Sequence, residues 1–171
     1  MIGQRCKMIK NKKNIMYLMI ILLIFMDQII KYYIEAYKEL LPQNIIQNFL
    51  NICYCENKGI AFSIGAGNVI FSIICNIVVL GILAKFIISQ NDRIGMQDKF
   101  ILSLVLAGGC SNLIDRILRG FVIDYIDINE LCTFPIFNFA DILICLGAIG
   151  FGISSLRYIK KKNEDKLNKC E

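Results

Sequence analysis

The chain has 171 residues, of which 56% are hydrophobic and only 19% are charged, and it carries a formal net charge of +5. This composition is too apolar for an ordinary soluble domain and indicates a membrane protein. The basic residues gather mostly at the two termini and no nucleic-acid-binding module is visible, so membrane orientation explains the charge better than nucleic-acid binding.

Four stretches are long enough to cross a hydrocarbon core as helices, which takes about 20 mainly apolar residues. They cover roughly residues 15–36, 68–89, 99–118 and 137–158. No linker, repeat or low-complexity tract separates them, so we expect a single integral membrane domain over residues 1–171. A cleaved signal peptide is the alternative interpretation of the first stretch, but its apolar core runs into Met26-Asp27-Gln28 and not into a small-residue cleavage site.

The connection between the first two predicted helices has a mixed composition. Residues 45–65 combine Ile, Phe and Tyr with Asn and Gly, which suggests short strands with a turn near Asn57-Lys58-Gly59. A loop that merely packs on the end of the bundle is an equally open alternative. The expected fold is therefore an all-α membrane protein of four transmembrane helices with a small extracytoplasmic β-like flap between helices 1 and 2.

The positions of the Lys and Arg residues indicate how the chain is oriented in the membrane. They precede the first span, occur in the short second connection as Arg93 and Lys99, and follow the fourth span, whereas the connections at 38–67 and 119–135 hold few. Positive residues mark the cytoplasmic side, so we expect both termini inside and both of those connections outside.

The sequence contains no His, which excludes Ser-His-Asp and Cys-His catalysis, the usual His-bearing zinc sites and a haem His ligand. The eight cysteines form no CxxC pair, and only Cys53, Cys55 and Cys132 fall near the expected outer face. Metal and dithiol chemistry are therefore weakly supported, and the remaining candidates for a general acid or base are carboxylates, Lys, Tyr and Cys.

Ionisable side chains at membrane depth are candidates for function. Asp27 and Lys31 are four residues apart, so they can pair on one helix face. Asp115 and Arg116 follow Asn112 at the outer end of the third span. Asp124 and Asp141 approach the same boundary from two different elements.

Two carboxylates brought together at a partly desolvated boundary tend to share a proton. The ionised one can take a proton from water while the protonated one polarises a carbonyl, as in an aspartic protease. The residues alone do not select the pair among Asp115, Asp124, Asp127 and Asp141, and Asp127 is interpreted as a solvated loop charge. A small transporter whose charges line an ion path and a non-catalytic scaffold remain alternatives, whereas the G-x-G-D motif of presenilin-like proteases is absent.

Five motifs, in order along the four predicted spans, resemble the lipoprotein signal peptidase family, also called signal peptidase II. They are DQIIK at 27–31 for D-x-x-x-K, NKGIAFS at 57–63 for N-x-G-x-A-F-S, GGCSNLIDR at 108–116 for a glycine-rich stretch that ends in G-N-x-x-D-R, GFVIDY at 120–125 for G-x-V-x-D-F, and FNFAD at 137–141 for F-N-x-A-D.

The resemblance implies an intramembrane aspartic endopeptidase that cleaves before the lipid-modified cysteine of diacylglyceryl-modified prolipoproteins. It implies Asp124 and Asp141 as the catalytic pair, with no metal or organic cofactor. The orienting and substrate-binding residues would be Asn57, Asn112, Arg116 and Asn138, and the supporting residues Asp27, Lys31, Gly59 and Asp115. The implied protein is a monomer of the bacterial cytoplasmic membrane, in contact with membrane lipids, with its site near the extracytoplasmic face.

The chain departs from the family motifs at three positions. Ser111 stands where the family has Gly, Ile142 follows the second aspartate where Ser or Thr is common, and Tyr125 replaces Phe. None of the three is a predicted catalytic carboxylate. We expect these departures to affect efficiency more than the reaction.

Overall fold

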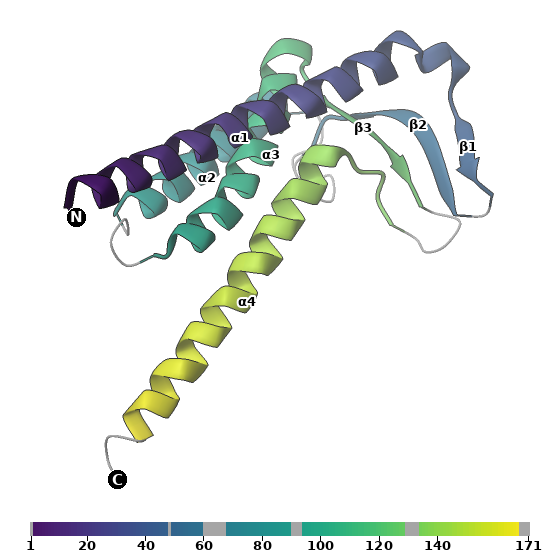
Figure 1. Cartoon of the computed structure of the whole chain (residues 1–171). Helices are drawn as coiled ribbons and strands as arrows, with labels where there is room; N and C mark the ends of the chain where they lie inside the picture. The colour runs from purple at the N-terminus through teal and green to yellow at the C-terminus, as the bar shows by residue number, and fades with distance from the viewer. Residues whose placement is uncertain (1, 48, 60–67, 90–93, 129–133, 168–171) are drawn as a thin grey trace.

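The computed structural model describes residues 2–47, 49–59, 68–89, 94–128 and 134–167. In chain order its elements are α1 (Ile2–Ala36), a 3-10 turn η1 (Lys38–Leu40), β1 (Gln43–Ile46), β2 (Leu50–Asn57), α2 (Val69–Ser89), α3 (Met96–Arg119), β3 (Val122–Asp127) and α4 (Phe139–Leu167) (Figure 1). All four α-helices are long and apolar enough to cross a membrane. The predicted fold class is confirmed. Ile60 to Ser63 of the second motif, Arg93, Cys132 and Cys170 lie outside the described residues.

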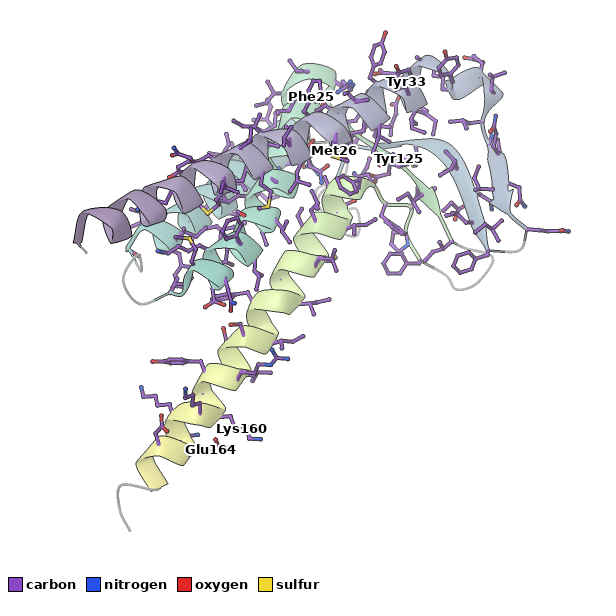
Figure 2. All side chains as sticks on the ribbon, in the orientation of Figure 1. Phe25, Met26, Tyr33, Tyr125, Lys160 and Glu164 are labelled. Atoms are coloured by element: carbon purple, nitrogen blue, oxygen red, sulfur yellow. The ribbon has the colours of Figure 1, made fainter. Side chains whose placement is uncertain are left out.

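Two helices extend beyond their predicted ends. α1 begins at Ile2, not at residue 15, because the Lys, Arg and Met residues that precede the apolar span are good helix formers. α4 continues to Leu167, beyond the predicted end at 158, through another charged stretch. Figure 2 shows Lys160 and Glu164 on this projecting end of α4. Apolarity therefore marks the part of each helix that can cross a membrane, not the whole helix.

α3 is the central helix, because α1, α2 and α4 all pack against it. Apart from Leu102, its buried positions are small or polar. At Gly108 the backbone lies so close to the Ala140 carbonyl of α4 that no side chain fits between them. Small residues let membrane helices approach closely. By contrast, Phe25 and Tyr33 point outward from α1, where no other element covers them (Figure 2). The bundle thus has a small-residue seam inside and an apolar surface outside.

A three-stranded antiparallel sheet, ordered β1-β2-β3, lies at the end of the bundle opposite both termini (Figure 1). β1 and β2 form the predicted flap, with β2 ending at Asn57, but β3 comes from the connection between α3 and α4 and was not predicted. The pairing places Asp124 of β3 opposite Cys55 of β2. Interpreting Asp127 as a solvated loop charge is wrong, since Asp127 is the partly buried last residue of β3.

The seam between α3 and α4 yields the first prediction. We expect Gly108→Ala to lower the free energy of unfolding by about 1–3 kcal/mol, because the added methyl group must push the α4 backbone away. Gly152→Ala on α4 is the matched control, since a Cβ there meets nothing within 4 Å and alanine favours the helix. Thermal unfolding in detergent measures both. Equal stability of the two variants would contradict this account of the seam.

Candidate active site

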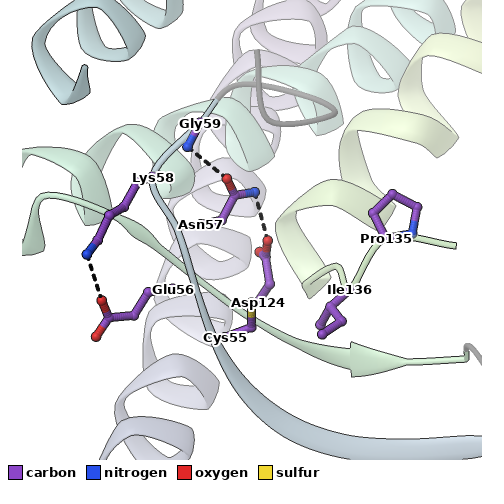
Figure 3. Close-up of a pocket in the computed structure, with 8 residues that line it drawn as sticks. All are labelled: Cys55, Glu56, Asn57, Lys58, Gly59, Asp124, Pro135 and Ile136. Carbon is purple, nitrogen blue, oxygen red and sulfur yellow. Dashed lines mark hydrogen bonds and ion pairs between the residues drawn. The ribbon is translucent and has the colours of Figure 1, made fainter. Parts of the chain in front are cut away.

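Asp124 lies where the sheet meets the helices. Strand alternation turns Val122, Asp124 and Ile126 to one face of β3, and Asp124 is only 2% exposed. Asn57 Nδ2 donates a hydrogen bond to Asp124 Oδ2 at 2.9 Å (Figure 3). Asn138 Nδ2 donates one to Asp124 Oδ1 at 2.6 Å. Both carboxylate oxygens therefore accept from amide groups, and each retains a further lone pair.

Asp141 lies in the first turn of α4, where it forms a capping box with Asn138. Asn138 Oδ1 accepts from the Asp141 backbone N–H at 2.9 Å, and Asp141 Oδ2 accepts from the Asn138 backbone N–H at 3.2 Å. Such reciprocal bonds satisfy two N–H groups that a helix start leaves unpaired. Because the amide nitrogen of Asn138 also holds Asp124, one side chain fixes both aspartates.

Asn112 of α3 contacts Asp141 from the other side. Its Nδ2 donates to Asp141 Oδ1 at 2.8 Å, while its Oδ1 accepts from Lys31 Nζ at 2.8 Å and from Asn138 Nδ2 at 3.3 Å. An ammonium group can only donate, so the Asn112 oxygen must face Lys31 and its NH2 group must face Asp141. Lys31 thereby sets the orientation of the Asn112 amide.

Lys31 also joins two aspartates, and all three side chains are fully buried. Its Nζ lies 2.8 Å from Asp27 Oδ2, as the four-residue spacing predicts, and 2.8 Å from Asp115 Oδ2. Asp115 Oδ1 in turn accepts from Arg119 Nη1 at 2.8 Å and from Gln28 Nε2 at 2.9 Å. With both oxygens occupied by these partners, Asp115 belongs to the support of the site.

Arg116 and Gly59 connect the flap to α3. Arg116 Nη2 donates to the Gly59 carbonyl at 2.7 Å, and Nη1 donates to the Asn112 carbonyl at 3.3 Å. The Gly59 N–H donates to Asn57 Oδ1 at 3.0 Å, which closes a turn after β2 (Figure 3). This bond directs the NH2 group of Asn57 to Asp124.

The surroundings of Asp124 favour its protonated form. Burial, followed by the nearby charge of Asp141, raises the pKa of Asp124 from 3.8 to about 6, although the bonds from Asn57 and Asn138 oppose this shift. A cavity of about 330 Å³ opens beside Asp124, with Asn57 on one side and Pro135 and Ile136 on the other (Figure 3). A carboxyl group that gains and loses a proton near neutral pH therefore faces a space that can admit a ligand.

The environment of the cysteines near the site disfavours the reactive thiolate form. Cys53 and Cys55 of β2 are free thiols, and burial raises the pKa of both, that of Cys53 to about 11. In the part of the chain that the structure describes, no three His, Cys, Asp or Glu side chains are grouped so that they could hold a metal ion.

The structure brings all ten predicted site residues into one connected network, within which Asp124 and Asp141 share Asn138 as a partner. Sequence reasoning missed Gln28, Glu35 and Arg119. Arg119 pairs with Asp115 across one helical turn, a spacing that could have indicated it, and also with Glu35 Oε2 at 3.0 Å. Glu35 and Gln28 reach the network only through the packing of α1 on α3.

Comparisons with known proteins agree on one family. The family model for signal peptidase (SPase) II matches residues 19–157. The lipoprotein signal peptidase of Thermodesulfovibrio yellowstonii is 39% identical over 145 residues, covering 81% of this chain and 92% of the relative. That of Staphylococcus aureus strain JH9 is 34% identical over 152 residues, covering 88% and 93%.

Solved structures show the same likeness. A bacterial membrane enzyme solved by the in meso method at 2.3 Å resolution matches with a TM-score of 0.78 and 32% identity, covering 87% of this chain and 92% of that one. A second, at 1.9 Å resolution, matches with a TM-score of 0.72 and 33% identity, covering 84% and 92%.

The buried ion network yields the second prediction. Lys31→Met should lower the free energy of unfolding by about 3–5 kcal/mol, because it removes the cation shared by two buried carboxylates. Lys85→Met on α2 is the control, since that lysine is exposed and the change should have little effect. Thermal unfolding in detergent compares the two. A Lys31→Met protein as stable as wild type would show that the ion network contributes nothing to the fold.

Proposed function

This chain belongs to the signal peptidase II family of membrane proteases, and from that premise we propose that it is an aspartic endopeptidase. It removes the signal peptide from diacylglyceryl-modified prolipoproteins by cleaving the amide bond before the lipid-modified cysteine. Asp124 and Asp141 activate the attacking water. The contact of Asn138 with both aspartates carries the proposal, because it fixes the two carboxyl groups together at one site.

The chemistry needs one proton shared between the two carboxyl groups. The ionised aspartate takes a proton from water, whose oxygen attacks the scissile carbonyl, while the protonated aspartate donates to the carbonyl oxygen. A proton is then delivered to the leaving nitrogen as the C–N bond breaks. The raised pKa of Asp124 supports this division of roles, since two neighbouring carboxylates do not both ionise readily.

The orienting residues have distinct tasks in this reaction. Asn112 and Asn138 hold the catalytic carboxylates, and Asn57, beside the cavity, both holds Asp124 and helps bind the peptide. Arg116 Nε has no hydrogen-bond partner among the described residues, so this buried group retains a donor for a substrate carbonyl. Asp27, Lys31, Gly59 and Asp115 support the site. The reaction requires no metal or organic cofactor.

The location of the site suits a lipid-modified substrate. The chain is a multi-pass membrane protein, and the sheet lies at the end of the bundle away from both basic termini (Figure 1). We place the termini in the cytoplasm and the site near the extracytoplasmic face of the bacterial membrane. There the diacylglyceryl chains stay in the bilayer while the scissile bond reaches water, and a monomer suffices because one chain supplies every site residue.

The third prediction concerns the catalytic pair. Asp124→Asn and Asp141→Asn should each reduce cleavage of a diacylglyceryl-modified prolipoprotein at least about a thousandfold, because neither variant can carry and transfer the shared proton. The measurement is cleavage by purified protein in lipid, with the same prolipoprotein lacking its diacylglyceryl group as a second substrate. We expect the unmodified substrate to remain intact.

The matched control is Asp165→Asn, which changes an exposed carboxylate on the projecting end of α4. It should cleave within about twofold of wild type, as surface-proximal substitutions away from special features have small effects. A folded wild-type protein that cleaves neither substrate would contradict the proposed function. Full activity of either dyad variant would contradict the assignment of the pair.

The fourth prediction is a pH shift. The step of the kcat/KM profile that reports ionisation of Asp124 should lie near pH 6, where burial places its pKa. The NH2 group of Asn57 stabilises the ionised carboxylate, so Asn57→Ala should raise the pKa of Asp124 and move that step to higher pH. Lys58→Ala is the control, because Lys58 pairs with Glu56 and is 57% exposed. A step that stays in place or moves to lower pH in Asn57→Ala would refute the role given to this bond.

A further inference from the structure

The first two N–H groups of α4 are held by partners from two other elements. The first N–H groups of a helix have no partner within it and must find one elsewhere. At α4 the Phe139 N–H donates to the phenolic oxygen of Tyr125 on β3 at 3.2 Å, and the Ala140 N–H donates to Asp27 Oδ1 on α1 at 3.0 Å. Figure 2 shows Tyr125 between the sheet and the start of α4. The turn that carries Asp141 is therefore fixed from outside the helix as well as by its own capping box.

The carboxylate of Asp27 is itself oriented by the hydroxyl group of Ser111. Ser111 Oγ on α3 donates to Asp27 Oδ2 at 2.6 Å and accepts from Gln28 Nε2 at 2.9 Å. Both Ser111 and Asp27 are fully buried. Among the residues that the structure describes, Asp27 pairs with one cation, Lys31, which it shares with Asp115, whereas Asp115 also pairs with Arg119. The Ser111 hydroxyl thus supplies a charge-assisted bond that keeps the second oxygen of Asp27 directed at the Ala140 N–H.

These two hydroxyls belong to residues at which the chain departs from the motif patterns quoted above, which give glycine in place of Ser111 and phenylalanine in place of Tyr125. Neither of those residues could make the bond observed here. The two departures therefore act on adjacent N–H groups of one helical turn, Tyr125 directly and Ser111 through Asp27.

We propose that Ser111 and Tyr125 are positioning residues, whose hydroxyls fix the first turn of α4 and so place the carboxylate of Asp141 against Asn112 and Asp124. The effect on catalysis rests on the proposed function, whereas the restraint on the turn does not. Neither hydroxyl touches the reacting atoms. Each acts on the geometry of the dyad, on which the rate of the chemical step depends steeply.

Amide hydrogen exchange tests the restraint without any substrate. Tyr125→Phe and Ser111→Ala each remove a hydroxyl with little change in volume, and each should raise the exchange rate of the amides at 139–141 by roughly fivefold, the effect of one lost hydrogen bond. The controls are Tyr158→Phe, an exposed tyrosine on α4, and Ser103→Ala, a buried serine of α3 whose hydroxyl donates to Phe100 O in its own helix. Both controls should leave exchange at 139–141 unchanged.

Cleavage kinetics test the consequence. Each hydroxyl variant should lower kcat about fivefold with KM unchanged, and the double variant should lower kcat at least about 25-fold, because substrate binding does not require the hydroxyls but alignment of Asp141 does. Thermal unfolding in the same lipid checks that every variant is folded at the assay temperature.

The two experiments separate the possible failures. Unchanged exchange at 139–141 in both variants overturns the inference whatever the protein cleaves. Faster exchange with wild-type kcat also overturns it, because the turn then would not govern Asp141. Faster exchange in a protein whose wild type cleaves no prolipoprotein would support the restraint and refute the proposed function instead.

Discussion

The site depends on one buried ammonium group. Lys31 Nζ has three N–H donors, and the structure directs them to Asp27, Asp115 and the oxygen of Asn112, each at 2.8 Å. A buried cation with unused donors would be costly, and so would either buried carboxylate without a partner. These costs tie α1 to α3 at a single register, because a shift of one residue between the two helices would separate Lys31 from both Asp115 and Asn112.

Because the ammonium group can only donate, it also determines which groups face the two aspartates of the proposed catalytic pair. Lys31 determines which end of the Asn112 amide is an acceptor, and the other end must then donate to Asp141. Asn138 is oriented in the same way, since its oxygen accepts from the Asp141 N–H and its nitrogen faces Asp124. The side-chain amides of Asn112 and Asn138 could each lie in two orientations. One orientation is selected in each case because the amide oxygen must accept from a group that can only donate, the Lys31 ammonium or the Asp141 backbone N–H. On these sides both aspartates accept hydrogen bonds from donors only, and their remaining lone pairs stay available for the water and the shared proton of the proposed reaction.

Much of this arrangement could be predicted because its signals are local or belong to a motif. The helical spacing of Asp27 and Lys31 predicts their pairing, and the five motifs name the ten residues of the network. The strand that carries Asp124 could not be predicted, because the six residues of β3 are too few to reveal a period and their partners in β2 lie 65 to 76 residues earlier. Because β3 was not predicted, Asp127 at its end was wrongly interpreted as a solvated loop charge. The hydroxyls of Ser111 and Tyr125 appeared only as departures, since their partners on α1 and α4 are distant in sequence.

The position of Asp141 illustrates why such distant bonds matter. Along its membrane-crossing part α4 packs mainly on one helix, α3, from Gly108 against the Ala140 carbonyl to Asp98 against Ser154, and its far end projects beyond the bundle (Figure 1). Packing on one side sets the distance between two helices but restrains rotation about the helix axis only weakly. A rotation of α4 would carry Asp141 away from Asn112. The bonds to Asn138, Asp27 and Tyr125 approach the first turn from different directions, so together they oppose the one movement that the seam permits.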